Sequence, residues 1–434
     1  MFSERVRRMK DSRLEGFYKK TPNERLQIVK AFANLTDEDV SVISNTGALG
    51  VDQADRMIEN VIGTMPLTLG IAVNFLINDR DYLIPMAIEE PSVVAAASNG
   101  AKMARHMGGF AASSTDPVMI GQVQLTGVPD PESAKSAILE KKDEIIELSN
   151  SKDPLLVKFG GGARDVKVRV ISTERGPMVI THLLVDCRDA MGANAVNTMV
   201  EALAPFIERI TGGKVYLRII SNLAKYRLSR ARAVFGRDAI GGENVVDGIL
   251  EAYAFAKADP FRAATHNKGI MNGISAAVIA TGNDFRAVES GCHSYASITG
   301  QYLPLTSYEK DSNGDLVGRI EVPMAIGLVG GATKVHPTAR VNVKILGVKT
   351  ANELGEILAA LGLAQNFAAL RALATEGIQR GHMSLHARNI ATSVGAKGDE
   401  VNKIVEILVR EKNVRMDRAQ EVLRDIRSKG KTSS

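Results

Sequence analysis

Apolar and polar positions follow one another along this chain with two different periods, which together predict a mixture of helices and strands. Residues 21–60 carry apolar side chains at helical spacing and are expected to form short helices. Residues 74–86 alternate between apolar and polar, as in a hairpin whose turn is Asn78-Asp79-Arg80. Glu89-Glu90-Pro91-Ser92 then places acids and a proline before the alanine-rich run 93–106, which predicts the start of a helix.

The segment from 117 to 222 has the clearest pattern. Its expected elements are strand 118–127, helix 131–150, strand 165–172, strand 177–187, helix 193–210 and strand 214–220. This β-α-β-β-α-β order is typical of the ferredoxin-like fold. We therefore predict a compact domain here, inserted into a larger one.

The pattern after residue 222 is more mixed. The expected elements are helix 245–258, a glycine-rich and small-residue segment over 264–281, strands near 317–326 and 339–346, helices 350–361 and 364–375, and a small helical bundle over 377–427. The strands flank a glycine cluster that begins at Gly327. Residues 429–434 are expected to be a disordered polar tail.

The predicted fold class is α+β. It comprises a large mixed domain, an inserted ferredoxin-like domain and a helical C-terminal domain. The expected boundaries are 1–116 and 223–376 for the two parts of the large domain, 117–222 for the inserted domain and 377–434 for the C-terminal domain.

Composition and charge narrow the class of protein. The chain has 434 residues, 54 Lys and Arg against 49 Asp and Glu, and a net charge of +5, which does not indicate a dedicated nucleic-acid binder. Cys187 and Cys292 are its only cysteines, which excludes a disulfide framework and favours a reducing compartment. The charged N-terminus is unlike a secretory signal, and no run approaches the ~18 uncharged apolar residues of a membrane-spanning helix. We therefore expect a cytoplasmic protein that does not bind membranes.

Two segments carry charged residues that packing does not require. In Glu89-Glu90-Pro91-Ser92, adjacent carboxylates repel one another, and burial of one would favour its protonated, proton-donating form. The alternative is a pair of acids stabilised by a helix N-terminus. In His266-Asn267-Lys268-Gly269 the ammonium of Lys268 would stabilise a developing oxyanion, and the alternative is a turn with a solvated lysine.

Two further positions suggest catalytic chemistry with a structural alternative. Asp284 would hold a nearby lysine charged and oriented, but it also suits the N-cap of a helix that begins at Phe285. His382 and His386 share a helix face. They lack the third ligand and the glutamate of a zinc motif, so no metal is predicted. His382 would instead protonate a leaving thiolate near neutral pH, and the alternative for each histidine is a place in the core.

A cofactor site is suggested by the run 186–194, Asp-Cys-Arg-Asp-Ala-Met-Gly-Ala-Asn, between a predicted strand and a predicted helix. A glycine here lets backbone N–H groups and the helix dipole face a pyrophosphate. The run lacks the G-x-G-x-x-G fingerprint, so a Rossmann domain is not predicted. The alternative is a tight strand-to-helix turn, and Gly160-Gly161-Gly162 is likewise explained by a flexible connector.

Taken in order, these segments resemble the signature segments of the class II 3-hydroxy-3-methylglutaryl-CoA (HMG-CoA) reductases. The matching segments are Glu59-Asn60-Val61-Ile62-Gly63-Thr64, Glu89-Glu90-Pro91-Ser92, Asp189-Ala190-Met191-Gly192-Ala193-Asn194, His266-Asn267-Lys268-Gly269, Gly282-Asn283-Asp284 and Gly381-His382-Met383. The resemblance extends from about residue 11 to residue 427. It implies the interconversion of HMG-CoA with mevalonate and CoA by two hydride transfers with a nicotinamide cofactor.

The resemblance also implies a role for each matching residue. Lys268 would stabilise the oxyanion, Glu90 would supply a proton, Asp284 would couple these two, and His382 would protonate the CoA thiolate. Residues implied to bind substrate are Ser92, Arg262, Thr265 and Asn272. Residues implied to bind the cofactor are Asp189, Met191, Gly192, Asn194, Asn222 and Asp153. A carboxylate at Asp153 would accept from the ribose 2′-hydroxyl and repel a 2′-phosphate, which favours NADH and leaves NADPH open.

The expected assembly also comes from the resemblance. It implies a homodimer, or a larger assembly of dimers, with the active site at the dimer interface. The C-terminal domain would close over the substrate as a flap, with Gly377 and Gly381 as hinges.

Two other classes of protein remain as alternatives. A CoA-dependent acyltransferase or thiolase-like lyase would need Cys187 or Cys292 as an activated nucleophile. A nucleic-acid-binding module would use the basic segment 225–237, which has cations at helical spacing and also suits a solvated helix face or CoA phosphates.

Overall fold

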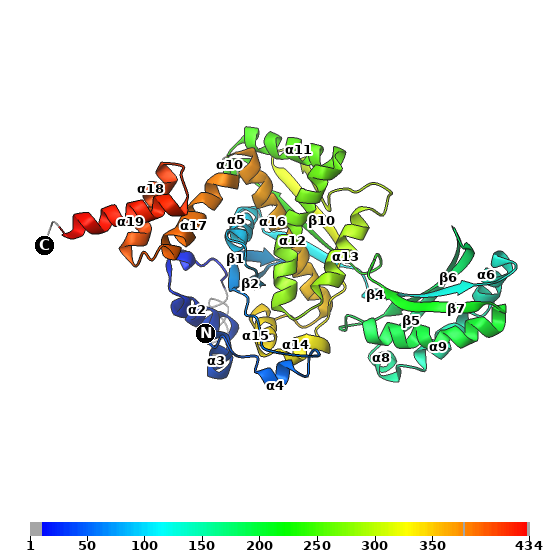
Figure 1. The fold of residues 1–434 in the computed structure, drawn as a ribbon. Coiled ribbons are helices and arrows are strands. Elements are labelled where there is room, and N and C mark those ends of the chain that lie inside the picture. The colour runs from blue at the N-terminus through cyan, green and yellow to red at the C-terminus, as the bar shows by residue number, and fades with distance from the viewer. Residues whose placement is uncertain (1–10, 376–377, 432–434) are drawn as a thin grey trace, which may run out of the picture.

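The computed structural model describes the backbone of residues 11–375 and 378–431, and the side chains of residues 11–375 and 386–428. The fold is α+β, as predicted, and is built around two separate sheets. The second sheet and the C-terminal helices lie at opposite ends of the molecule, with the first sheet between them (Figure 1).

The first sheet has six strands in the spatial order β2-β1-β3-β8-β10-β9. They are β1 (Leu69–Ile77), β2 (Arg80–Ala87), β3 (Phe110–Ser114), β8 (Leu228–Phe235), β9 (Thr306–Lys310) and β10 (Leu316–Pro323). The predicted hairpin is β1–β2, with Asn78 and Asp79 in the left-handed conformation that its two-residue turn requires. All neighbours are antiparallel except β1 and β3.

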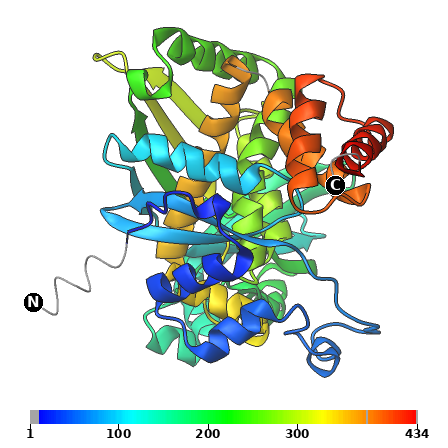
Figure 2. The same ribbon diagram turned by 90° about the vertical axis from the view of Figure 1, so that its left-hand side faces the viewer.

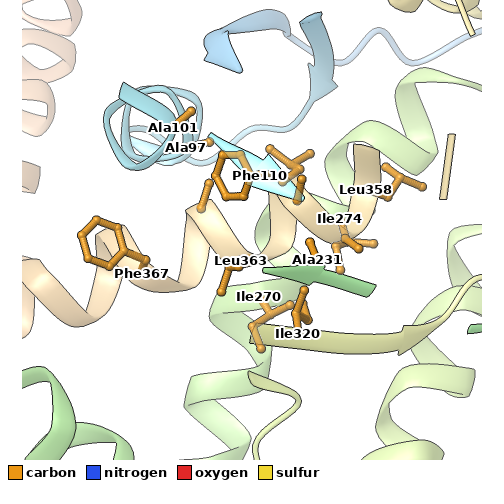
Figure 3. Close-up of a cluster of buried hydrophobic side chains, with 14 of the residues drawn as sticks. Ala97, Ala101, Phe110, Ala231, Ile270, Ile274, Ile320, Leu358, Leu363 and Phe367 are labelled. Atoms are coloured by element: carbon orange, nitrogen blue, oxygen red, sulfur yellow. The ribbon is translucent and has the colours of Figure 1, made fainter. Parts of the chain in front are cut away.

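Three helices pack against this sheet and carry most of the core between them. They are α5 (Val93–Arg105), α12 (Pro260–Ala280) and α16 (Ala351–Ala374). Figure 3 shows Phe110 of β3 and Ile320 of β10 in contact with the same cluster as Ile274 of α12 and Leu363 of α16. Helices α10 (Arg237–Ile240), α11 (Glu243–Ala258) and α13 (Phe285–Ala296) complete this part of the fold.

The second sheet contains the predicted β-α-β-β-α-β unit. Its strands lie in the order β5-β6-β4-β7 and are β4 (Val118–Thr126), β5 (Gly162–Thr173), β6 (Gly176–Asp186) and β7 (Lys214–Ser221). In the order of this unit's own strands the arrangement is 2-3-1-4, which is the ferredoxin-like topology. Its helices are α6 (Pro131–Glu140), α7 (Lys142–Asn150), α8 (Pro154–Lys158) and α9 (Ala193–Thr211), of which α6, α7 and α9 share a separate core with one face of the sheet. The boundaries of the domains remain predictions.

Short helices at both ends of the chain form two smaller cores. The N-terminal set is η1 (Phe17–Lys19), α2 (Pro22–Ala33), α3 (Asp37–Ser44) and α4 (Val51–Ala54). Residues of α2 pack with β1, β2 and α15 (Pro337–Leu346). The C-terminal set is α17 (Ile378–Ser393), α18 (Asp399–Arg410) and α19 (Met416–Lys431), a bundle with its own apolar centre (Figures 1 and 2).

Three sequence predictions were wrong, and each error concerns a helix. Residues 339–346 form α15 and not a strand, because Pro337 occupies its first position and the His336 side chain caps it by accepting from the Ala339 N–H. The glycine-rich segment 264–281, for which no element was predicted, belongs to α12 up to Ala280, with Thr281 as the C-cap. The two helices expected over 350–375 are the single helix α16, and the helix expected over 131–150 is broken at Lys141, where the sequence has no glycine or proline.

Helix α16 also corrects the expectation about apolar runs. By length and composition it is the one helix of the described residues that meets the criterion for crossing a membrane. However, 67% of its apolar window is buried inside the protein, and Figure 3 shows its side chains within the core. We therefore interpret α16 as the core helix of the large unit.

A buried polar network fixes α12 against β9 and α16. His266 is 1% exposed, and its Nε2 lies 2.6 Å from the Thr306 hydroxyl oxygen. The Thr306 hydroxyl donates to the Asn366 side-chain oxygen at 2.9 Å, so its oxygen accepts from a protonated Nε2. Burial, followed by the charge of Arg262, lowers the pKa of His266 to about 3. The network therefore requires a neutral imidazole one turn or less from Thr265 and Lys268.

We expect this histidine to make the protein less stable in mild acid. Its folded pKa of about 3 lies below the ordinary value of 6.5, so the unfolded chain binds a proton that the folded protein excludes. The contribution is complete above pH 6.5, is lost as the pH falls toward 3, and amounts to about 2 kcal/mol by about pH 5. Urea unfolding at about pH 7.5 and pH 5 should show a larger loss for the wild type than for His266→Asn.

The control for this experiment is His106→Gln, because His106 is exposed. That variant should lose as much stability in acid as the wild type. Equal losses for the wild type and His266→Asn would contradict the assignment.

Candidate active site

One face of α12 carries four of the residues singled out in the sequence. Arg262, Thr265, Lys268 and Asn272 are spaced by three, three and four positions, which places them along the same side of a helix. The helix begins after Asp259, whose carboxylate accepts from the Phe261 N–H at 3.2 Å. Lys268 therefore lies on a helix. The turn that the sequence analysis allowed as an alternative is not formed.

The structure brings two of the four predicted catalytic residues into contact. The Lys268 ammonium donates to the Glu90 carboxylate at 2.9 Å, joining α12 to the segment that precedes α5. The side chains are 60% and 33% exposed, so this ion pair contributes little to the free energy of folding. Both charged groups therefore remain accessible to a ligand.

Beside Glu90, Ser92 has an unusual backbone and an unsatisfied side chain. It is the N-cap of α5 with φ of 74°, a left-handed conformation that is uncommon for serine. Its hydroxyl oxygen is buried and has no hydrogen-bond partner. Among the described residues, the Arg262 guanidinium also makes no hydrogen bond or ion pair, and burial lowers its pKa. A free hydroxyl and a free guanidinium are suitable partners for a substrate carboxylate.

Asp284 occupies the N-cap of α13, the structural alternative considered for it. One oxygen, Oδ1, accepts from the Arg286 and Ala287 N–H groups at 3.0 and 3.1 Å, and the same oxygen lies 3.3 Å from the Arg286 guanidinium. Within the residues that the structure covers, no hydrogen bond joins Asp284 to Lys268 or Glu90. The fourth predicted residue, His382, falls in α17, and its side chain lies outside the described residues, as does the predicted hinge Gly377.

The proposed cofactor loop runs from the end of β6 to α9. Gly192 is the N-cap of α9 with φ of 104°, and α9 has no side-chain cap, so the N–H groups of its first turn are available to an anion. A Cβ at this position would lie 2.4 Å from the Cys187 sulfur, which is why only glycine fits. Asn194 is exposed at the same helix end. The loop therefore fits a pyrophosphate group.

A segment that the sequence did not assign connects this loop to Asp284. The Gly327 N–H donates to the Asn283 side-chain oxygen at 2.8 Å, and the Leu328 N–H donates to the Asp189 carbonyl at 2.8 Å. A Cβ on Gly327 would lie 2.5 Å from the Met191 nitrogen. The only sequence signal for this junction was the glycine cluster that begins at Gly327.

Two of the three other predicted cofactor residues have local structural partners. The Asp189 carboxylate accepts from the Ala351 N–H at 2.7 Å, at the start of α16. The Asp153 carboxylate caps α8 by accepting from the Leu156 N–H at 2.9 Å. Asn222 is exposed at the end of β7. None of these contacts excludes a ligand, because each carboxylate retains an oxygen for which no hydrogen bond is described.

The two alternative classes of protein are not supported. Burial raises the pKa of Cys187 to about 12 and also raises the pKa of Cys292, so neither provides a thiolate near neutral pH. The basic segment 225–237 contains the strand β8 and not a helix. Within it Arg227 is buried and Arg230 pairs with Glu321, so its cations do not share one exposed face.

Comparison with known proteins gives a consistent result. A family model of hydroxymethylglutaryl-coenzyme A reductase matches residues 21–387. The 3-hydroxy-3-methylglutaryl-coenzyme A reductase of Archaeoglobus fulgidus is 66% identical over 426 residues, which cover 98% of this chain and 97% of that protein. The probable reductase of Borreliella burgdorferi is 34% identical over 430 residues, with 95% of each chain covered.

A solved structure is similar over the same length. The class II 3-hydroxy-3-methylglutaryl-CoA reductase of Streptococcus pneumoniae, bound to NADPH in open conformations, has a TM-score of 0.80 and 41% sequence identity to this chain. The match covers 94% of this chain and 100% of that one. The fold and the matches thus define an NAD(P)-dependent oxidoreductase. The chain belongs to the hydroxymethylglutaryl-coenzyme A reductase family, in its class II, prokaryotic-type branch.

We expect Gly192→Ala to destabilise the protein by about 3 kcal/mol or more, because the new Cβ adds an overlap with the Cys187 sulfur to the strain of the left-handed backbone. The matched control is Gly212→Ala at the other end of α9. Gly212 is also left-handed, but a Cβ there meets nothing within 4 Å, so that change should cost about 1 kcal/mol. Urea unfolding measures both, and equal losses would show that the overlap is relieved without cost.

Proposed function

We propose that the chain interconverts HMG-CoA with mevalonate and CoA at the Glu90–Lys268 pair. The observation that carries the proposal is the 2.9 Å contact between these side chains. The unsatisfied Ser92 hydroxyl lies two residues from Glu90, and Arg262, whose guanidinium has no described partner, lies on the same side of α12 as Lys268. When bound, the nicotinamide cofactor supplies the two hydride equivalents of this four-electron reaction.

The proposed roles follow from the charges that the reaction develops. Reduction of a thioester carbonyl places negative charge on its oxygen, and the Lys268 ammonium would stabilise that charge. Glu90 would deliver the proton that the oxygen finally takes, because its carboxyl group lies within hydrogen-bond distance of the same ammonium.

Asp284 and His382 would complete the catalytic set. All described contacts of the Asp284 carboxylate use Oδ1, so Oδ2 is available to couple with Lys268 when the site closes. His382 would protonate the CoA thiolate, which prevents the thiolate from adding back to the aldehyde. Its place on α17 fits a C-terminal flap that consists of residues 377–434.

Substrate would lie along the polar face of α12. Ser92 and Arg262 would bind the carboxylate, and Thr265 and Asn272 would contact the hydroxyl and carbonyl groups. Glu90 and Ser92 line a cleft of about 2560 Å³ that extends to the exposed Lys102 on α5. Such a cleft has room for a CoA thioester and offers a cation for its phosphates.

The cofactor would bind to the unit of residues 117–222, with Asp189, Met191, Gly192, Asn194 and Asn222 around its pyrophosphate and nicotinamide halves. The relative from Streptococcus pneumoniae binds NADPH. In this chain the Asp153 carboxylate supports a preference for NADH, because it would repel a 2′-phosphate.

We also propose that the working form is a cytoplasmic homodimer, or an assembly of dimers, with the active site at the dimer interface. The exposed segment around Ile58, Ile62 and Met65 supports this, because these apolar side chains are 66%, 103% and 83% exposed in the single chain. It contains the matching segment Glu59 to Thr64, and Ile58 and Met65 line the same cleft as Glu90.

The proposal is tested by mixing the protein with HMG-CoA and reduced cofactor and following the absorbance of the cofactor. We expect consumption by the wild type and a loss of kcat of about 100-fold or more in Lys268→Ala. Lys257→Ala, an exposed lysine on α11, is the control and should keep full activity. No consumption by the wild type with NADH or NADPH, in either direction, would reject the function, and appreciable activity of Lys268→Ala would reject the role of Lys268.

We expect Asp153→Asn to weaken discrimination against NADPH. Asparagine keeps an oxygen to cap α8 and removes only the charge, so the local fold should be retained. The ratio of kcat/KM for NADH to that for NADPH should fall about tenfold or more in the variant. An unchanged ratio, with unchanged thermal stability, would remove Asp153 from cofactor recognition.

A further inference from the structure

Arg227 is a buried cation whose guanidinium, among the described residues, hydrogen bonds only to backbone carbonyls. It is 3% exposed and lies in the turn that leads into β8. Its guanidinium donates to the carbonyls of Ala190 at 2.9 Å, Met191 at 3.2 Å and Ile326 at 2.5 Å, with a longer contact of 3.5 Å to that of Arg188. Three of these four acceptors belong to the cofactor loop.

No carboxylate hydrogen bonds to this guanidinium among the described residues. The nearby Asp186 is 2.9 and 3.3 Å from two other guanidiniums, those of Arg188 and Arg164, and the Asp189 carboxylate accepts from the Ala351 N–H. A buried cation without a direct counter-ion is costly. The fold therefore tolerates a positive charge directly behind the loop.

The same charge lies close to a helix end of the same sign. Ala190 and Met191, which Arg227 holds, are followed at once by Gly192, the N-cap of α9. A helix N-terminus carries partial positive charge, so a cation beside it is unfavourable until an anion binds. α9 also has no side chain of its own at the cap. The two observations independently favour an anion at this point.

Arg227 also connects the cofactor loop, residues 186–194, to the segment that contains Asn283 and Asp284. Its contact with the Ile326 carbonyl fixes the residue before Gly327, whose N–H binds Asn283, and Asn283 is followed by Asp284. The loop of the second sheet and the N-terminus of α13 are thus held in one arrangement by a single side chain and a short backbone segment.

We propose that Arg227 is a positioning residue for the dinucleotide: it sets the conformation of residues 188–191 and supplies positive charge behind the pyrophosphate. This rests on the proposed function, because it deepens the cofactor site assigned there. Arg227 touches neither substrate nor cofactor itself. It acts through the carbonyls that it orients.

The test uses the full-length protein and the variant Arg227→Lys, which keeps the charge but cannot reach four carbonyls. We expect the KM for NADH to rise about tenfold to a hundredfold, while the KM for HMG-CoA changes less than about twofold. Calorimetry should show the same loss of affinity for ADP-ribose, which carries the pyrophosphate, and no loss for adenosine. The matched control is Arg230→Lys, three residues further on, whose side chain is exposed and paired with Glu321.

A second variant decides the matter if Arg227→Lys does not fold. Gly327→Ala leaves Arg227 intact but places a Cβ 2.5 Å from the Met191 nitrogen, so it should displace the loop and weaken ADP-ribose binding as well. If folded Arg227→Lys binds ADP-ribose as the wild type does, with only its melting temperature lowered, Arg227 is structural and the proposal is wrong. If Arg227→Lys does not fold and Gly327→Ala binds ADP-ribose normally, the conformation of residues 188–191 does not set the affinity, and the proposal is also wrong. If the wild type binds neither ADP-ribose nor NADH, the proposed function itself fails, and that result is distinct from a loss confined to the variants.

Discussion

The position of the cofactor loop depends on one buried guanidinium. Arg227 satisfies carbonyls from the loop that follows β6 and from the segment that follows β10, and these segments belong to different sheets of the fold. Buried backbone carbonyls outside helices and strands need hydrogen-bond donors. A planar guanidinium has five N–H groups and can donate to several of them at once. At this point, where the small and large units meet, one side chain donates to both segments.

The proposed catalytic face, on α12, is held in place for a different reason. α12 passes through the main core, where its apolar residues contact α16 and the first sheet (Figure 3), and the polar network of His266, Thr306 and Asn366 fixes its rotation. A helix held in this way presents Lys268 in a fixed direction. Site residues carried by packed helices are placed more accurately than those on loops. Glu90 reaches the same point from the strained turn before α5, whose cost is accepted where a ligand is to be bound.

The separation of the two units suits a reductase of this class. The ferredoxin-like sheet has its own core and can carry a dinucleotide site without the βαβ fingerprint, while the large unit provides the face of α12 and the cleft beside Glu90. The Asn283–Gly327 hydrogen bond joins the two proposed sites. The segment at Gly327 thus contacts both the loop that leads to Gly192 and the segment that contains Asp284. The similarity to the Streptococcus pneumoniae enzyme extends over both units, which indicates that the whole arrangement, and not one domain, is the feature of the family.

By itself the sequence determined the ferredoxin-like unit, because its strands and α9 bury one face and leave the other polar, and such elements keep a readable period. It did not determine α12, α15 or α16. Helices α12 and α16 are buried on most sides, so their sequences have no clear alternation of apolar and polar faces. The start of α15 depends on the cap at His336. Glu90 and Lys268 were predicted to be catalytic because the ordered motifs resemble those of the family. Only the tertiary structure placed them in contact, because they are 178 positions apart and no local pattern spans that distance. In the sequence, Arg227 is one of several cations in a basic segment. Its burial among carbonyls could not be predicted, because burial depends on the packing of the whole chain and not on the residue type.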